Sequence, residues 1–338
     1  MFRDNLSTII QGVDLSAEQT AEMITDIFSG EIGDAQIGGF MAALATKGET
    51  FEELAGAARA MRRKAVSVQT TAKTVMDIVG TGGDGAQTFN ISTTASFVVA
   101  GGGVTVAKHG NRAISSKCGS ADVLEALGVN LTVAPEIVEE AINTVGIGFM
   151  FAPLYHGAMR HAAKARQQLG VRSIFNMLGP LTNPAAANCQ VLGVYAPQLT
   201  EMFAQALKLL GAKRVLVVHG HDGLDEISVC APTRVSELND GMIRTYDINP
   251  EQYFENPAEA DDLRGGDSAQ NAVITTDILN GQTGPKRDVV LINAAAAFMA
   301  AGMAKDLKNG IQAAEEAIDS GAAIAKLEAL AQFTQENA

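Results

Sequence analysis

Several polar clusters in this sequence contain residue types that can bind a phosphorylated ligand. The first, residues 80–85 (GTGGDG), directly follows a short β-type run, 75–79. Four glycines within six positions let backbone N–H groups point at an anion. The segment lacks the Lys-Ser/Thr ending of a Walker loop and the spacing of the Rossmann fingerprint. The alternative is an ordinary tight turn between a strand and a helix, and this loop alone does not decide between the two.

The second cluster, Asn90, Ser92 and Thr93, stands where a helix is expected over 92–100. Ser92 or Thr93 is a plausible N-cap, and a cap needs only one such residue. Three polar residues at a helix N-terminus also make a favourable anion or metal site, because the helix dipole favours negative charge there.

The third cluster follows an expected strand over 104–107, at the edge of an α/β sheet where ligands bind. Arg can contact phosphate oxygens in a bidentate manner, and Lys offers a compact charge. The alternative is a solvated basic loop, and Cys118 within this stretch is expected to be a small buried residue. The cluster comprises Lys108, His109, Gly110, Asn111, Arg112, Ser115, Ser116, Gly119 and Ser120.

Two further stretches add carboxylates and cations. Asp225 and Glu226 come soon after an expected strand over 214–218. Adjacent loop carboxylates are good Mg²⁺ ligands, because Mg²⁺ takes one or two carboxylates with water and phosphate oxygens; the alternative is a pair of solvated acids. Arg160 and Arg166 are candidates for binding the carboxylate of an acidic substrate. The neighbouring His156 and His161 are equally compatible with packing on a helix.

Helices are expected throughout residues 1–65. Ser16 with Gln19, and Thr50 with Glu53, have capping-box spacing. Asp34 is expected to cap the helix between them, and Gly30 and Gly48 to end helices. The apolar residues recur at helical spacing, so this segment predicts a small helical module.

After a polar linker over 67–73, strands alternate with helices, which predicts βαβ units and a mainly parallel sheet. Asn239-Asp240-Gly241 indicates a hairpin turn. A late strand is expected over 289–292. The other expected strands are 147–151, 190–195, 234–238 and 242–246, and the other helices are 121–127, 135–144 and 200–210.

Composition excludes several classes of protein. The 338 residues carry a formal net charge of −13, which argues against sequence-independent nucleic-acid binding. The N-terminus lacks a signal pattern, and the most apolar stretch, 95–107, is too short to span a bilayer. Cys118, Cys189 and Cys230 are far apart, as is typical of a reducing compartment. We expect a cytoplasmic protein with no membrane and no nucleic-acid partner.

Taken in order, the motifs GTGGD, NIST, KHGNR, GSADVLEALG, LGPL and GLDE resemble the anthranilate phosphoribosyltransferases of tryptophan biosynthesis over essentially the whole chain. This resemblance implies a small helical domain (1–72), joined in space by about 160–185, a hinge, and a larger α/β domain (73–338). It implies transfer of the phosphoribosyl group from phosphoribosyl diphosphate (PRPP) to the amine of anthranilate. It also implies Mg²⁺ as cofactor and a homodimer formed through the small domains.

The resemblance also implies site residues. Anthranilate is expected at Gly80, Asn111 and Arg166, with His109 and His156 nearby, and Mg²⁺ at Ser92, Asp225 and Glu226. Catalysis is expected to rest on positioning and charge stabilisation, without a dedicated nucleophile. Gly157 stands where Pro or Ser is expected, which should loosen a helix start. PRPP is expected at Gly80, Gly83, Asp84, Thr88, Asn90, Ile91, Ser92, Thr93, Lys108, His109, Gly110, Asn111, Arg112, Ala113, Ile114, Ser115, Ser116 and Ser120.

Two other functions fit parts of the pattern. A pyrimidine nucleoside phosphorylase shares this architecture and a glycine-rich phosphate loop, but Asn111-Arg112 and Asp225-Glu226 favour the transferase. A non-catalytic nucleic-acid-binding paralogue is disfavoured by the charge of −13 and by the intact polar clusters.

Overall fold

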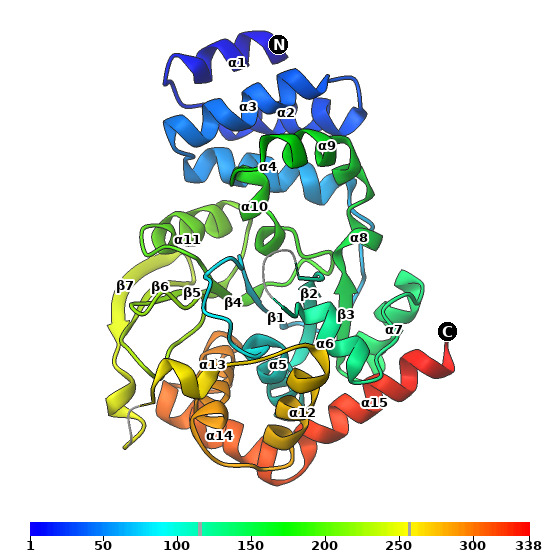
Figure 1. Cartoon of the computed structure of the whole chain (residues 1–338), viewed down its shortest axis with the longest axis vertical. Helices are drawn as coiled ribbons and strands as arrows, with labels where there is room; N and C mark the ends of the chain where they lie inside the picture. The colour runs from blue at the N-terminus through cyan, green and yellow to red at the C-terminus, as the bar shows by residue number, and fades with distance from the viewer. Residues whose placement is uncertain (114–116, 256–257) are drawn as a thin grey trace.

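The computed structural model describes residues 1–113, 117–255 and 258–338. The helical N-terminal part is drawn at the top of Figure 1. It contains helices α1 (Phe2–Ile10), α2 (Ala17–Ser29), α3 (Asp34–Lys47) and α4 (Phe51–Lys64).

The ends of these helices follow from their capping residues. Both expected capping boxes are confirmed, at Ser16 and at Thr50, and Gly30 ends α2 in the left-handed conformation. The expected Asp34 cap is wrong, because Gly33 is the N-cap and Asp34 is the first residue of α3. A carboxylate in the first turn is still favoured there by the helix dipole.

Seven strands in the described part of the chain form one sheet, in the order β3-β2-β1-β4-β5-β6-β7. β1 to β5 run parallel, and β6 and β7 are antiparallel, so the mainly parallel sheet is confirmed. Asp240 and Gly241 have φ of 45° and 84°, as the expected hairpin turn requires. The strands are β1 (Val75–Gly80), β2 (Thr105–Gly110), β3 (Ile147–Phe151), β4 (Cys189–Gly193), β5 (Arg214–Gly220), β6 (Thr233–Asn239) and β7 (Met242–Ile248).

Helices cover the sheet and connect its strands. Between the strands lie α5 (Ile91–Gly101), α6 (Ser120–Ala126), α7 (Pro135–Thr144), α8 (Ala152–Tyr155), α9 (Arg160–Leu169), α10 (Ile174–Met177) and α11 (Leu199–Leu209). After β7 lie α12 (Ser268–Leu279), α13 (Pro285–Ala300), α14 (Leu307–Asp319) and α15 (Ala322–Glu336). Short 3-10 turns are η1 (Gly157–Met159), η2 (Gly179–Leu181), η3 (Pro250–Gln252) and η4 (Ala260–Leu263).

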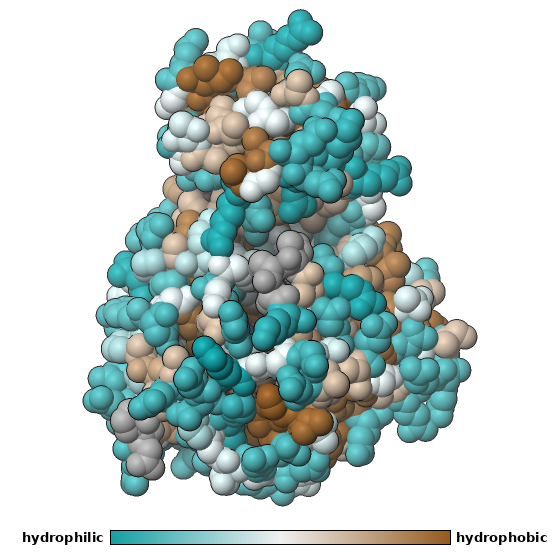
Figure 2. Space-filling model, in the orientation of Figure 1, coloured by the Kyte–Doolittle hydropathy of each residue, from teal (hydrophilic) through white to brown (hydrophobic). Residues whose placement is uncertain are grey.

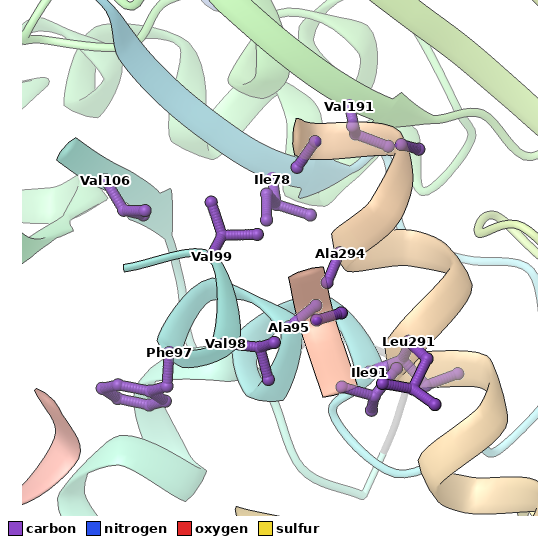
Figure 3. Close-up of a cluster of buried hydrophobic side chains, with 14 of the residues drawn as sticks. Ile78, Ile91, Ala95, Phe97, Val98, Val99, Val106, Val191, Leu291 and Ala294 are labelled. Carbon is purple, nitrogen blue, oxygen red and sulfur yellow. The ribbon is translucent and has the colours of Figure 1, made fainter. Parts of the chain in front are cut away.

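One face of the sheet packs against α5 and α13. Figure 3 shows Ile78 and Val191 from the sheet beside Val99 of α5 and Ala294 of α13, and all four are buried. The strand expected over 289–292 is wrong, because these residues lie within α13. A short buried apolar run has no periodicity that separates strand from helix, and here Pro285 starts a helix that is buried on most sides.

The opposite face shares its core with the helical part. Leu192 of β4, Val217 of β5 and Phe203 of α11 belong to the same buried cluster as Leu54 of α4. Ala162 of α9 belongs to it too, and Figure 1 shows α9 beside the N-terminal helices. The helical part therefore packs on the sheet through α11. This packing places α9 near the carboxyl ends of the strands.

The surface is mainly polar on the face drawn in Figure 2, with apolar residues in scattered patches over both parts of the molecule. Among the helices of the described ranges, none has the length and apolar character needed to cross a bilayer.

Candidate active site

A cleft of about 820 Å³ lies at the carboxyl ends of β1, β2, β4 and β5. β1 has β2 on one side and β4 on the other, so this is the point where the strand order switches direction, where α/β sheets bind ligands. The expected PRPP residues that are described all line this cleft: Gly80, Gly83, Asp84, Thr88, Asn90, Ile91, Ser92, Thr93, Lys108, His109, Gly110, Asn111, Arg112, Ala113 and Ser120. The expected residues Ile114, Ser115 and Ser116 lie outside the described part of the chain.

Glycines let the loop after β5 reach the ends of β1 and β4. A Cβ on Gly80 would lie 2.5 Å from Asp225 Oδ2, and one on Gly193 would lie 1.5 Å from the Asp225 carbonyl oxygen. The Gly82 N–H donates to Asp225 Oδ2 at 2.7 Å. Gly82 and Gly83 have φ of 67° and 78°, which residues with side chains rarely adopt. The small size of these glycines thus brings a carboxylate against the loop.

Asp84, Asp225 and Glu226 concentrate negative charge in the cleft. Burial, followed by the charge of Asp84, raises the pKa of Asp225 to about 7. Burial, followed by the charge of Asp225, raises the pKa of Glu226 to about 8. A divalent cation would stabilise the ionised form of both groups, so the pair fits Mg²⁺. Within the described residues, no three acidic, His or Cys side chains converge to hold a metal on their own.

The start of α5 faces these carboxylates. The Ser92 N–H donates to Glu226 Oε1 at 3.2 Å. The N-cap is Asn90 and not Ser92 or Thr93 as expected. Asn90 is fixed from outside the helix, since Asn271 Nδ2 donates to Asn90 Oδ1 at 2.9 Å. Thr93 Oγ1 is buried and has no partner among the described residues.

Lys108, which lines the cleft, and Asp77 are buried groups of opposite charge type on neighbouring strands. Lys108 Nζ donates to the Ile78 carbonyl oxygen at 2.5 Å. Burial lowers the pKa of Lys108, although the charges of Asp77 and Glu226 act to raise it. Burial raises the pKa of Asp77 to about 6. Asp77 accepts hydrogen bonds from the His109 N–H at 3.1 Å and from Asn183 Nδ2 at 2.7 Å. These bonds fix the end of β2 and the segment after α10.

His109 and His156 form a buried pair at the side of the cleft. Their Nε2 atoms lie 3.2 Å apart, and His109 Nδ1 lies 3.1 Å from the Gly179 carbonyl oxygen. Burial, followed by the charge of His156, lowers the pKa of His109 to about 3, and burial lowers that of His156 to about 4. Both rings are therefore neutral at pH 7. His109 lines the cleft, whereas His156 does not line it and contacts the His109 ring.

Arg112 is already paired with acids of α6. Its guanidinium bonds Asp122 at 3.0 Å and Glu125 at 2.9 Å, which raises the pKa of Arg112. Asp122 also accepts hydrogen bonds from the N–H groups of Ala113 and Gly119, at 3.0 and 2.8 Å. In this arrangement Asp122 links Arg112, Ala113 and Gly119, and the charge of Arg112 is balanced by the two acids.

Arg166 of α9 lines the cleft from the helical side, 5.7 Å over the Phe175 ring, and burial lowers its pKa. Arg160, the other candidate for a substrate carboxylate, is exposed and does not line the cleft. His161 lies against Gly30, so it packs between α9 and α2.

Sequence reasoning missed several lining residues. Arg172 and Tyr195 line the cleft, as do Gln167 and Asn176. Tyr195 follows β4 in the same way that the polar clusters follow β1 and β2. This position after a strand could have identified Tyr195 as a candidate lining residue. Arg172 carries no such signal. The segment between α9 and α10 that contains it approaches residues 80–85, called the glycine loop below, only in the folded chain.

Comparisons with known proteins agree with this geometry. Residues 72–324 match a model described as the glycosyl transferase family a/b domain, and residues 3–65 its helical bundle domain. The anthranilate phosphoribosyltransferase of Desulfosudis oleivorans is 67% identical over 338 residues, which span all of both chains.

Solved structures are similar over nearly the whole chain as well. The anthranilate phosphoribosyltransferase of Thermus thermophilus is 45% identical with a TM-score of 0.93, over 98% of this chain and 99% of that one. That of Saccharomyces cerevisiae in complex with PRPP and Mg is 29% identical with a TM-score of 0.90, over 99% of this chain and 98% of that one. This chain therefore belongs to the glycosyl transferase family with helical bundle and a/b domains, and within it to the anthranilate phosphoribosyltransferases.

Proposed function

We propose that the cleft binds PRPP along the loop after β1 and the start of α5, and anthranilate beside Arg166, Asn111 and Gly80. The observation that carries this is the convergence of these groups with Asp84, Asp225 and Glu226 on one cavity. The solved yeast relative in complex with PRPP and Mg supports the same ligands here. The anthranilate nitrogen attacks the anomeric carbon, the bond to diphosphate breaks, and the amine releases a proton.

The residues around the cleft suit a reaction driven by positioning. An aromatic amine is neutral at pH 7 and attacks without a strong base, so binding both substrates in line supplies much of the acceleration. Negative charge builds on the departing diphosphate. The N–H groups of the loop after β1 that follow Gly82, and the positive end of the α5 dipole, would stabilise it. His109 and His156, both neutral, lie on the anthranilate side in this proposal.

Ser92, Asp225 and Glu226 would hold Mg²⁺ in this proposal. The raised pKa values of the two carboxylates support it, because a cation would compensate their mutual repulsion. When bound, Mg²⁺ supplies charge neutralisation for the diphosphate. The chain's own contribution is to hold the carboxylates at the loop through Gly82 and Ser92.

Substitution of Arg166 tests the anthranilate site. Arg166→Ala should raise the KM for anthranilate roughly 10- to 100-fold and the KM for PRPP much less, because a charged hydrogen bond is lost on one substrate only. Arg160→Ala, at the exposed start of the same helix, is the matched control. A larger rise in the PRPP KM would move Arg166 to the phosphate side.

We also propose that the chain divides into domains at residue 72, with a hinge between them. We further propose that it forms a homodimer and is cytoplasmic. Ile10 and Val13 support association through the helical part, since they are 68% and 51% exposed there. Cell fractionation would test the location, and recovery of the protein with membranes would contradict it.

A further inference from the structure

Arg172 joins two segments that are far apart in the chain. It lies between α9 and α10, and its Nη2 donates to the Gly83 carbonyl oxygen at 2.5 Å. Its guanidinium lies 4.2 Å over the ring of Tyr195, which follows β4. Arg172, Gly83 and Tyr195 all line the cleft.

This contact completes the anchoring of the glycine loop. The Thr81 N–H donates to the Gly193 carbonyl oxygen at 2.9 Å, and the Thr81 hydroxyl accepts from the Tyr195 N–H at 3.1 Å. The Gly82 N–H is held by Asp225. Arg172 holds the next residue, Gly83, by its carbonyl oxygen. Each residue from Thr81 to Gly83 thus has a backbone group bonded to a different part of the fold.

Holding one carbonyl oxygen sets the direction of the next N–H. The peptide group is planar and trans, so the bond to the Gly83 oxygen also fixes where the Asp84 N–H points. Gly83 has a φ of 78°, and Gly82 and Gly85 in the same loop are also at positive φ, so this backbone has access to alternative conformations. A peptide flip would exchange an N–H donor for a carbonyl acceptor beside a bound anion. The guanidinium opposes that flip.

Arg172 also differs from other cations of the cleft. Lys108 lies beside Asp77 and Glu226, and Arg112 bonds Asp122 and Glu125. Within the described ranges, Arg172 makes no ion pair with a carboxylate and contacts a carbonyl oxygen and an aromatic face instead. A guanidinium stacked on a ring is held in one orientation, which a Lys ammonium cannot reproduce.

We propose that Arg172 is a positioning residue for PRPP, which acts by holding the Gly83 carbonyl oxygen so that the glycine loop keeps its anion-binding form. Tyr195 holds the guanidinium in place. This inference rests on the proposed function, in which the loop after β1 binds the diphosphate-bearing substrate.

Steady-state kinetics with both substrates test this role. Arg172→Ala should raise the KM for PRPP about ten-fold, equivalent to about 1.4 kcal/mol, and the KM for anthranilate less than about two-fold. The KM of Arg172→Lys for PRPP should be closer to that of Arg172→Ala than to that of the wild type. A charge alone does not restore the contact between the planar guanidinium and the Tyr195 ring. An equal rise in both KM values, no change, or full rescue by Lys would overturn the proposal.

Tyr195→Leu provides an independent arm. It should also raise the KM for PRPP. In the double variant with Arg172→Ala, the KM should rise by less than the product of the two single increases, because both substitutions disrupt the same contact. Full multiplicativity would overturn the coupling. Hydrogen exchange of the amides over 82–86 should be faster in Arg172→Ala, with Arg160→Ala as control, and equal exchange would contradict the loop mechanism.

Calorimetric titration with PRPP and MgCl₂ separates this inference from the function beneath it. Wild-type protein that does not bind PRPP would refute the proposed function itself. Wild-type and Arg172→Ala proteins that bind PRPP equally would refute only the role of Arg172. The expected result is binding by both, weaker by about ten-fold in the variant.

Discussion

The carboxylates of Asp225 and Glu226 are subject to opposing effects at the scale of single residues. They accept hydrogen bonds from the N–H groups of Gly82 and Ser92, which favours their ionised forms. Burial and mutual repulsion favour their neutral forms and raise both pKa values. These hydrogen bonds do not offset burial and repulsion, since both pKa values stay raised, and a divalent cation between the carboxylates and a substrate phosphate would stabilise the ionised forms.

The acidic pair can be tested by removing its charge and keeping its shape. Asp225→Asn with Glu226→Gln should raise the Mg²⁺ concentration needed for half-maximal activity and lower turnover, while the far-ultraviolet circular dichroism stays unchanged. Titration of activity with MgCl₂ measures this. An unchanged Mg²⁺ dependence would refute the metal assignment.

The buried histidine pair predicts a loss of stability in acid. The pKa values of His109 and His156, about 3 and about 4, lie below the unfolded value of about 6.5, so unfolding takes up protons below that pH. For each ring, the free energy of unfolding should fall by up to about 1.4 kcal/mol per pH unit as the pH falls from about 6.5 towards the folded pKa of that ring. Urea denaturation of wild type and His156→Gln between pH 4.5 and 7 should show a shallower loss in the variant, and equal slopes would contradict this account.

Single residues also show what the sequence can and cannot predict. Polar residues directly after strands were predictable, because the carboxyl ends of parallel strands meet at one edge. The pairing of Arg112 with Asp122 and Glu125 was not, since a charged residue near phosphate-type motifs gives no sign of its partners. Arg172 was missed because its contact depends on how the helical part is seated on the sheet.

At the scale of elements, close contact between strand ends and the β5–β6 loop builds the cleft. Gly193 belongs to β4, and its missing side chain leaves room for the Asp225 backbone. A side chain there would push the acidic pair away from the glycine loop.

Gly193→Ala tests that contact. It should lower the unfolding free energy by about 1–3 kcal/mol through overpacking, and should lower turnover as Asp225 moves. Gly157→Ala is the matched control, because nothing lies within 4 Å of its added Cβ, and its stability should be unchanged or raised by up to about 1 kcal/mol. Thermal unfolding and activity assays measure both, and equal effects of the two substitutions would contradict the steric argument.

Elements differ in how far local sequence determines them. Capping boxes and the hairpin at Asp240-Gly241 were predicted correctly, because short-range hydrogen bonds and positive φ have specific residue requirements. Residues 289–292 were assigned to a strand and are helical, because helix α13 is buried on most sides and shows no polar stripe. The choice between strand and helix was made there by tertiary packing.

The whole molecule joins a helical part and an α/β part through a shared core around α11. That core holds α9, and with it Arg166, over the sheet edge. We expect the helical part to associate with a second copy, so light scattering after gel filtration should give twice the chain mass of 35.2 kDa. Ile10→Asp with Val13→Asp should reduce that mass to the monomer value. A wild-type protein that is monomeric at micromolar concentration would contradict the homodimer.

The most direct test of the whole account follows anthranilate fluorescence in the presence of PRPP, with and without Mg²⁺. We predict that fluorescence falls only when enzyme, PRPP and Mg²⁺ are all present, and that Asp225→Asn with Glu226→Gln slows the fall. Folded protein that leaves the fluorescence unchanged under all these conditions would contradict it.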